Sequence, residues 1–297
     1  MLTKSLKFEN FEKKNKSSQI RKYLKNILKK NNEVVKSLHR DYKLSYPKKI
    51  ISKAKKFEEV QLIGMGGSIL GAKTIYNFLS HKIKKKFSFI DNIKTGNFKI
   101  SSKKKLNLVI SKSGNTLETI SNSNIFLDKK NTNIFITENK KSYLRDLAFK
   151  LKSEIIDHNN FIGGRYSVLS ETGMLPAILM DLNPNKFKQF DTLIRNKKFL
   201  DTLVENASTI LSLHNSKKFN SIILNYDENS SDLFYWYQQL VAESLGKKGK
   251  GILPIVSNLP KDNHSLMQLY LDGTKNNFFT FFSALDKKSE TINNKFL

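Results

Sequence analysis

A glutamate and an arginine stand in sequence surroundings that suit proton transfer. Glu243 lies near the C-terminal end of the otherwise apolar stretch 232–245, which is predicted to be helical. The negative end of a helix and partial burial both disfavour an ionised carboxyl, so a carboxylate placed there becomes a stronger base. Arg165 follows the pair Gly163-Gly164, where backbone N–H groups beside a fixed cation would stabilise an oxyanion. These residue types predict proton abstraction beside a stabilised oxyanion; a solvated glutamate and an ordinary surface turn are the alternatives.

A histidine could add further acid–base chemistry. His264 is predicted at the start of a short helix over 265–271, and an imidazole can relay protons near neutral pH. The plainer alternative is a residue that only caps or packs against that helix. The other histidines show no metal-ligand spacing, so we expect no metal site. They are His39, His81, His158 and His214.

A second group of residues has the composition of a phosphate site. The apolar run 106–110 ends in Ser111-Lys112-Ser113-Gly114, and a helix is predicted over 116–127. Backbone N–H groups at a helix start favour an anion, and Lys112 adds a charge. Asn115 followed by Glu118 predicts a capping box. The hydroxyl donors would be Ser111, Ser113, Thr116 and Thr119. This loop predicts binding of a phosphorylated small molecule, with an ordinary capped turn as the alternative.

A glycine-rich turn could bring a backbone close to the same ligand. The sequence Gly64-Met65-Gly66-Gly67-Ser68 follows a predicted strand, and Gly71 completes the segment. It matches neither the dinucleotide fingerprint nor a P-loop. Glycines allow a close approach of backbone to ligand, and Ser68 could donate a hydrogen bond from the helix start. Tight packing of a strand on a helix is the alternative.

Alternating strands and helices must position these segments. Apolar runs predict strands over 60–63, 87–90, 106–110, 133–137 and 154–156, and helical periodicity predicts helices over 17–42, 68–79, 116–127, 142–151 and 171–180. After helical residues 186–213, strands over 221–225, 252–256 and 278–282 alternate with helices over 232–245 and 265–271. This order predicts α/β architecture with parallel sheets flanked by helices, which bind ligands at the carboxyl ends of their strands. We expect a helical segment over 1–45, one domain over 46–195, and a shorter, incomplete one over 196–297.

Composition argues for a soluble cytoplasmic protein. The chain has 297 residues, of which 39% are hydrophobic, and it has no cysteine. It lacks both a membrane-spanning apolar run and a signal peptide. The net charge of +26 invites a nucleic-acid interpretation, but only five of the 52 basic residues are arginines. Because base and phosphate recognition favours arginine, the lysines indicate a compositional bias, and we expect neither a nucleic-acid nor a membrane partner.

Five of these segments, taken in order, resemble the phosphoglucose isomerase family. The resemblance runs from about residue 59 to 283 and covers the glycine loop 64–71, the phosphate loop 111–119, the Gly-Gly-Arg-Tyr-Ser signature at 163–167, the segment 239–247 and the His-Ser-x-x-Gln-Leu motif at 264–269. The middle of the phosphate loop, Ser113-Gly114-Asn115, departs from the usual sequence of the family. The resemblance implies two sugar-isomerase (SIS) domains and an aldose–ketose isomerase of glycolysis and gluconeogenesis that acts on glucose 6-phosphate and fructose 6-phosphate.

The resemblance also implies roles for individual residues. Glu243 would move a proton between C1 and C2 through a cis-enediolate, Gly164 and Arg165 would stabilise its charge, and Gln239 would orient the substrate. The implied phosphate and substrate ligands are Gly67, Ser68, Ser111, Lys112, Ser113, Thr116 and Thr119. His264 would assist ring opening in the site of a neighbouring subunit, which implies a homodimer. No metal or organic cofactor is implied.

One departure from the family leaves alternatives open. The resemblance implies further helices and a lysine that aids ring opening, but no segment here matches them, and we expect a truncated chain. A non-catalytic sugar-phosphate-binding module is therefore one alternative. The wording Ser113-Gly114-Asn115-Thr116 favours a second, a dual phosphoglucose/phosphomannose isomerase.

Overall fold

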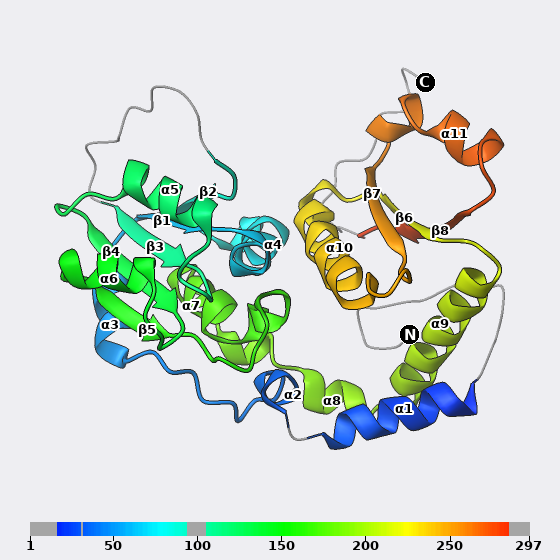
Figure 1. Cartoon of the computed structure of the whole chain (residues 1–297), viewed down its shortest axis with the longest axis horizontal. Helices are drawn as coiled ribbons and strands as arrows, with labels where there is room; N and C mark the ends of the chain where they lie inside the picture. The colour runs from blue at the N-terminus through cyan, green and yellow to red at the C-terminus, as the bar shows by residue number, and fades with distance from the viewer. Residues whose placement is uncertain (1–16, 31, 94–104, 285–297) are drawn as a thin grey trace.

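The protein contains two parallel β-sheets joined through helices (Figure 1). A computed structural model describes residues 17–30, 32–93 and 105–284. The first sheet has the strand order β2-β1-β3-β4-β5, and the second has the order β7-β6-β8. The strands are β1 Glu59–Gly64, β2 Lys86–Ile90, β3 Leu106–Ile110, β4 Thr132–Thr137, β5 Glu154–Asp157, β6 Asn220–Asn225, β7 Leu253–Asn258 and β8 Asn277–Phe282. The predicted α/β class with parallel sheets is confirmed.

Helices cover both faces of the five-stranded sheet, which explains why its central strands β1, β3 and β4 are almost wholly buried. One face packs against α3 Lys48–Ala54, α4 Leu70–Phe78 and α7 Glu171–Leu179. The other packs against α5 Leu117–Phe126 and α6 Tyr143–Lys150. All five residues of β3 are buried. Burying both faces fixes the strand ends that carry the loops.

The order of the strands brings two predicted loops together. β1 pairs in parallel with β3, and Gly64 lies beside Ile110 in the register. The glycine turn follows β1, and the loop beginning at Ser111 follows β3, so both leave the same edge of the sheet. This edge is the carboxyl end, where open parallel sheets bind ligands.

The second sheet presents one long helix to the first. This helix, α10 Ser231–Leu245, packs against both β7 and α4. In Figure 1 it lies between the three-stranded sheet and α4. The small core of the second sheet includes Ile222, Leu224 and Leu259. Residues 239 and 243 therefore come from the second sheet's helix and meet elements of the first.

Several predicted helices have different bounds in the structure. The predicted helix over 17–42 is two helices, α1 Ser18–Lys29 and α2 Glu33–Ser37; residue 31 lies outside the described residues. Asn32 starts the second because its side chain accepts a hydrogen bond from the Val35 amide at 2.9 Å. The predicted helical residues 186–213 form two helices, α8 Phe190–Arg195 and α9 Lys197–Asn215. The helix predicted over 265–271 is α11 Met267–Asp272. Within the described part of the chain, no helix has the length and apolarity needed to cross a membrane.

Candidate active site

Two glycine turns meet backbone to backbone at the edge of the first sheet. The turn after β1 contains the 3₁₀ helix Gly66–Ser68, and Gly164–Leu169 is a second 3₁₀ helix before α7. A Cβ atom added to Gly67 would lie 2.2 Å from the carbonyl carbon of Gly164 and 2.5 Å from the amide nitrogen of Arg165. Gly66 has φ +52°, and a Cβ atom there would lie 2.8 Å from Nε2 of Gln239. Only glycine allows this contact, which places Arg165 and Gln239 around one turn.

Replacing Gly67 by alanine should destabilise the fold, because the added methyl group would collide with the backbone of the neighbouring turn. We expect the free energy of unfolding to fall by about 1–3 kcal/mol, measured by urea titration. The matched control is Gly164→Ala, because a Cβ atom at Gly164 meets nothing within 4 Å. Equal stability of the Gly67→Ala variant and the wild type would contradict the close contact.

The guanidinium of Arg165 joins the glycine turn to helix α10. Its Nη1 donates to Oε2 of Glu243 at 2.9 Å, and its Nε donates to Oγ of Ser244 at 3.0 Å. Nε2 of Gln239 donates to the other carboxylate oxygen of Glu243 at 2.8 Å. Three of the predicted site residues, Arg165, Gln239 and Glu243, thus form one connected group. A fixed cation beside a carboxylate is an arrangement that can move a proton next to a developing negative charge.

Three aromatic and hydroxyl side chains that sequence reasoning left without a role support this group. The hydroxyls of Tyr166 and Ser244 are hydrogen-bonded at 2.8 Å, and Arg165 lies 4.5 Å from the centre of the Tyr166 ring. Nε1 of Trp236 donates to the carbonyl oxygen of Arg165 at 2.9 Å. Tyr166 and Ser244 stand next to predicted site residues in sequence, which was the available signal.

Arg165 and Tyr166 each shift the pKa of the other. Partial burial by itself raises the pKa of Tyr166, but the hydrogen bond with Ser244 and the charge of Arg165 outweigh burial and lower that pKa below its usual value. Burial by itself lowers the pKa of Arg165, but Tyr166 and Glu243 raise that pKa by more, so the net shift is upward. The guanidinium therefore remains a permanent cation.

Glu243 is more exposed than expected. Its side chain retains 48% of its accessible surface, whereas partial burial was predicted. The reason is that α10 presents this face to an open cleft of about 490 Å³. Glu243, Gln239 and Gly66 line the cleft together with Lys73, Asp91 and Asp232. The carboxylate is thus held by Arg165 and Gln239 and not by an apolar pocket.

Hydrogen bonds of its own serine and threonine hydroxyls hold the predicted phosphate loop together. Ser111 and Thr116 are joined through their hydroxyl oxygens at 3.0 Å. The amide of Gly114, whose φ is +65°, donates to Oγ of Ser111 at 3.2 Å. Ser113 is exposed, and its hydroxyl accepts the Asn115 amide at 3.2 Å. The loop is compact and carries hydroxyl groups at the start of α5, as a phosphate site requires.

The predicted capping box is wrong. Helix α5 begins at Leu117, and its N-cap is Thr116, which makes no side-chain capping bond. Asn115 is turned away because its side chain accepts the amide of Tyr143 at 2.9 Å, at the start of α6. Glu118 is consequently the second residue of the helix and cannot complete the box.

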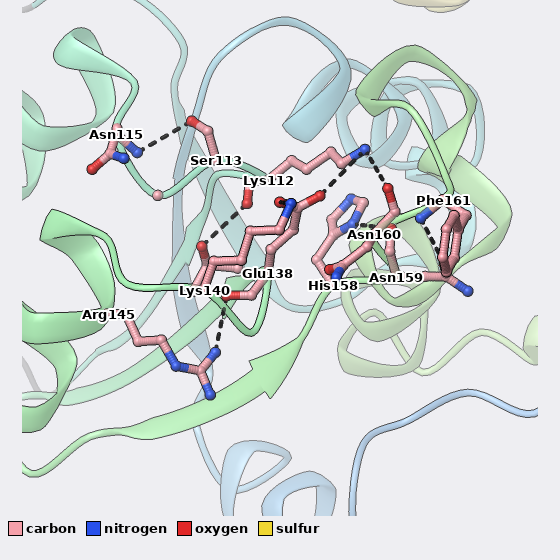
Figure 2. Close-up of polar contacts among 12 residues, drawn as sticks. Lys112, Ser113, Asn115, Glu138, Lys140, Arg145, His158, Asn159, Asn160 and Phe161 are labelled. Carbon is pink, nitrogen blue, oxygen red and sulfur yellow. Dashed lines mark hydrogen bonds and ion pairs between the residues drawn. The ribbon is translucent and has the colours of Figure 1, made fainter.

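Lys112 points toward the neighbouring strand end and not into the loop (Figure 2). Its Nζ donates to the carbonyl oxygen of Asn160 at 2.9 Å and lies 3.4 Å from a carboxylate oxygen of Glu138. Burial raises the pKa of Glu138, but Lys140 and Lys112 lower it by more. This acid therefore neutralises part of the charge that the loop was expected to offer an anion.

The other predicted ligands differ in their access to the loop. Ser68 lies beside Gly64 and near the end of β3, since a Cβ atom at Gly64 would be 3.3 Å from Cβ of Ser68 and 3.0 Å from the carbonyl oxygen of Ile110. Thr119 is fully buried one turn inside α5, and its hydroxyl oxygen has no hydrogen-bond partner among the described residues. The structure thus places Ser68 near the strand end that precedes the Ser111–Thr116 loop and buries Thr119 within α5.

His264 is not part of the Arg165–Glu243 group within this chain. It ends the 3₁₀ helix Lys261–His264 before α11, and its side chain is exposed. In the described ranges, it makes no side-chain hydrogen bond or ion pair with another residue. Over the same ranges, no cluster of three or more histidine, aspartate or glutamate side chains could hold a metal ion.

The arrangement of the sheets and helices is shared with two solved structures. A glucose-6-phosphate isomerase from Chlamydia trachomatis has a TM-score of 0.67 at 20% identity, covering 89% of this chain and 63% of that one. A hypothetical protein from Thermus thermophilus has a TM-score of 0.65 at 22% identity, covering 89% of this chain and 69% of that one. The chain therefore has the α/β fold of this glucose-6-phosphate isomerase structure.

Sequence comparison narrows this class to a family. The model of the family described as phosphoglucose isomerase matches residues 22–275. Glucose-6-phosphate isomerase from Methanocaldococcus jannaschii is 35% identical over 247 residues, which cover 77% of this chain and 60% of that protein. The Campylobacter jejuni enzyme of the same name is 30% identical over 260 residues, or 79% of this chain and 63% of that protein. The chain belongs to the phosphoglucose isomerase family and spans about 60% of the length of these relatives.

Proposed function

We propose that this chain interconverts glucose 6-phosphate and fructose 6-phosphate. The observation that carries the proposal is the connected group of Arg165, Glu243 and Gln239, set beside the Gly66-Gly67 turn at the edge of an open cleft. Family membership and the names of the relatives support the same reaction. We also propose a division into a helical segment over 1–45 and domains over 46–195 and 196–297, of which residues 1–16, 31, 94–104 and 285–297 lie outside the described part of the chain.

In this proposal Glu243 exchanges a proton between two neighbouring carbon atoms. Its carboxylate takes the proton from C2 of the open-chain aldose, which leaves a cis-enediolate with its negative charge on O1, and returns the proton to C1. The hydroxyl proton on O2 passes to O1 in the same conversion, so that C2 becomes the carbonyl carbon of the ketose. Arg165 and the backbone around Gly164 stabilise the negative oxygen of the enediolate. Gln239 keeps the carboxylate oriented through its hydrogen bond. No group outside the protein is needed to balance this step.

The experiment that tests the activity is a coupled assay on the purified chain. Fructose 6-phosphate is supplied, and the formation of glucose 6-phosphate is followed by its oxidation with NADP⁺. The proposal expects turnover that depends on the chain, and an absence of turnover at high protein concentration would reject it. A phosphate dianion is costly to move through an apolar membrane interior, so a hexose phosphate stays in the compartment where it forms. We propose that this compartment is the cytoplasm.

The Ser111–Thr116 loop, with Ser68, is proposed to bind the phosphate group. Thr116→Val should weaken binding of glucose 6-phosphate about 10- to 100-fold, because it removes a hydroxyl that would bond a charged group. Helix α5 should be unaffected, since Thr116 makes no side-chain capping bond. Calorimetric titration measures the affinity, and Thr192→Val, at an exposed position on α8, is the control. Unchanged affinity would argue against a phosphate site in this loop.

We place His264 in the site of a second copy of the chain. The support is its exposed side chain and its separation from the Arg165–Glu243 group within one copy. In a symmetric dimer, a copy with Glu243→Gln and a copy with His264→Asn would together contain one intact site. Random mixing should restore about one quarter of wild-type activity, because half of the dimers are mixed and half of their sites are intact. Mixtures no more active than the separate variants would show that the site is not shared.

A further inference from the structure

Four side chains of helix α10 lie on one face, which is turned toward helix α4 and the glycine turns of the first domain. Asp232, Trp236, Gln239 and Glu243 follow one another at spacings of four, three and four residues, which places them along one stripe of an α-helix. In the middle of this stripe, Trp236 donates a hydrogen bond to the carbonyl oxygen of Arg165. Near its end, Glu243 accepts a hydrogen bond from the guanidinium of Arg165. These contacts hold the middle and the C-terminal end of α10. The direction of the helix axis also depends on what its first turn contacts.

Lys73 supplies that attachment from helix α4. Its Nζ lies 2.7 Å from a carboxylate oxygen of Asp91, just after β2, and 3.4 Å from Oδ1 of Asp232, in the first turn of α10. Asn77, one turn further along α4, donates to Oδ2 of Asp232. Both oxygens of this buried carboxylate are therefore held by α4.

The two carboxylates keep the ammonium group of Lys73 charged, which keeps the link closed. Burial by itself lowers the pKa of Lys73, but Asp91 and Asp232 raise it by more, so the ammonium group remains charged. The Lys73 side chain retains 28% of its accessible surface and that of Asp232 only 10%, so water screens this ion pair less than it screens a surface pair. Removing one partner leaves a carboxylate that is buried and incompletely paired.

We propose that Lys73 and Asp232 are positioning residues that fix the direction of α10 and so place Glu243 against the substrate. They touch neither Arg165 nor Glu243 through a hydrogen bond, and they act through the helix that carries Gln239 and Glu243. This inference rests on the proposed isomerase function for its kinetic effect. Its structural part, the docking of α10 on α4, holds independently of any activity.

The kinetic test compares Lys73→Met, Asp232→Asn and the double variant with Lys55→Met. Lys55 is the control because it pairs with Asp181 on an exposed surface, where the two side chains retain 45% and 59% of their accessible surface. Each single variant should lower kcat about 10-fold or more and leave KM within about threefold, because a small misplacement of the base slows the reaction more than it weakens binding. The double variant should lose no more than the worse single variant, since both break one link.

A second readout needs no activity. Trp236 is the chain's single tryptophan, and it lies on the attached face of α10. When the link is broken, its emission should move to longer wavelength and become more accessible to acrylamide, whereas Lys55→Met should leave both unchanged. If Lys73→Met does not fold, Asp232→Asn, which keeps the size of the side chain, gives the same test.

The outcomes separate this inference from the proposed function. A wild-type chain without isomerase activity but with the expected change in Trp236 emission would reject the function and keep the docking link. Unchanged emission together with unchanged kcat in Lys73→Met and Asp232→Asn would overturn the link. Additive losses in the double variant would also overturn it, since they would show that the two residues act separately.

Discussion

Replacing Glu243 by glutamine is expected to lower kcat for the interconversion of fructose 6-phosphate and glucose 6-phosphate about 100- to 10,000-fold, the usual contribution of a positioned proton-transfer group. The amide keeps the size of the side chain and one oxygen that can still accept from Gln239 or Arg165, but it cannot take a proton from carbon. KM should therefore change little.

The control for this variant is Glu228→Gln, which removes an exposed carboxylate in the 3₁₀ helix Glu228–Ser230, immediately before α10. It should leave kcat at the wild-type value. Initial rates for both variants are measured in the coupled assay at several substrate concentrations. Near-normal turnover in Glu243→Gln would mean that another residue is the base.

Arg165→Met is expected to lower kcat about 100- to 1,000-fold, the range found when one stabiliser of an oxyanion is removed. The methionine keeps an unbranched side chain but loses the cation, the ion pair with Glu243 and the hydrogen bond to Ser244. Arg165→Lys should restore only the charge, because an ammonium group lacks the planar set of donors with which the guanidinium reaches Glu243 and Ser244 together.

The same assay compares Arg165→Met with Arg165→Lys and with Arg195→Met, which removes an exposed arginine on α8. We expect the order Arg195→Met, Arg165→Lys and Arg165→Met, from most to least active. An Arg165→Met enzyme with more than half of the wild-type kcat would contradict the role of this guanidinium.

Local sequence predicted the elements that hold the site. Strand β3, Leu106–Ile110, has the predicted bounds because a run that is apolar except for Asn107, lying between polar segments, fits a strand covered on both faces. Helix α10 differs from its prediction by one residue. The resemblance to the phosphoglucose isomerase family is confirmed. Three residues that the resemblance named, Arg165, Gln239 and Glu243, lie together in the structure.

Tertiary contacts decided what the sequence could not. Asn115 was expected to cap α5, but its side chain serves the start of α6, which is distant in sequence. Lys112 was expected to face an anion, but Glu138 and Asn160 hold it at the neighbouring strand end. Glu243 was expected to be partly buried, but its helix face borders an open cleft. Each error concerns the direction of a side chain, which local periodicity does not determine.

The central claim, that Glu243 moves a proton on a bound hexose phosphate, is tested most directly by hydrogen exchange. The purified chain is incubated with fructose 6-phosphate in D₂O, and deuterium at C1 of the ketose and at C2 of newly formed glucose 6-phosphate is measured by NMR. The account predicts deuterium at these carbons with the wild-type chain and essentially none with Glu243→Gln. Binding of fructose 6-phosphate by the wild-type chain without exchange at either carbon would contradict the account and identify a module that binds sugar phosphates without catalysis.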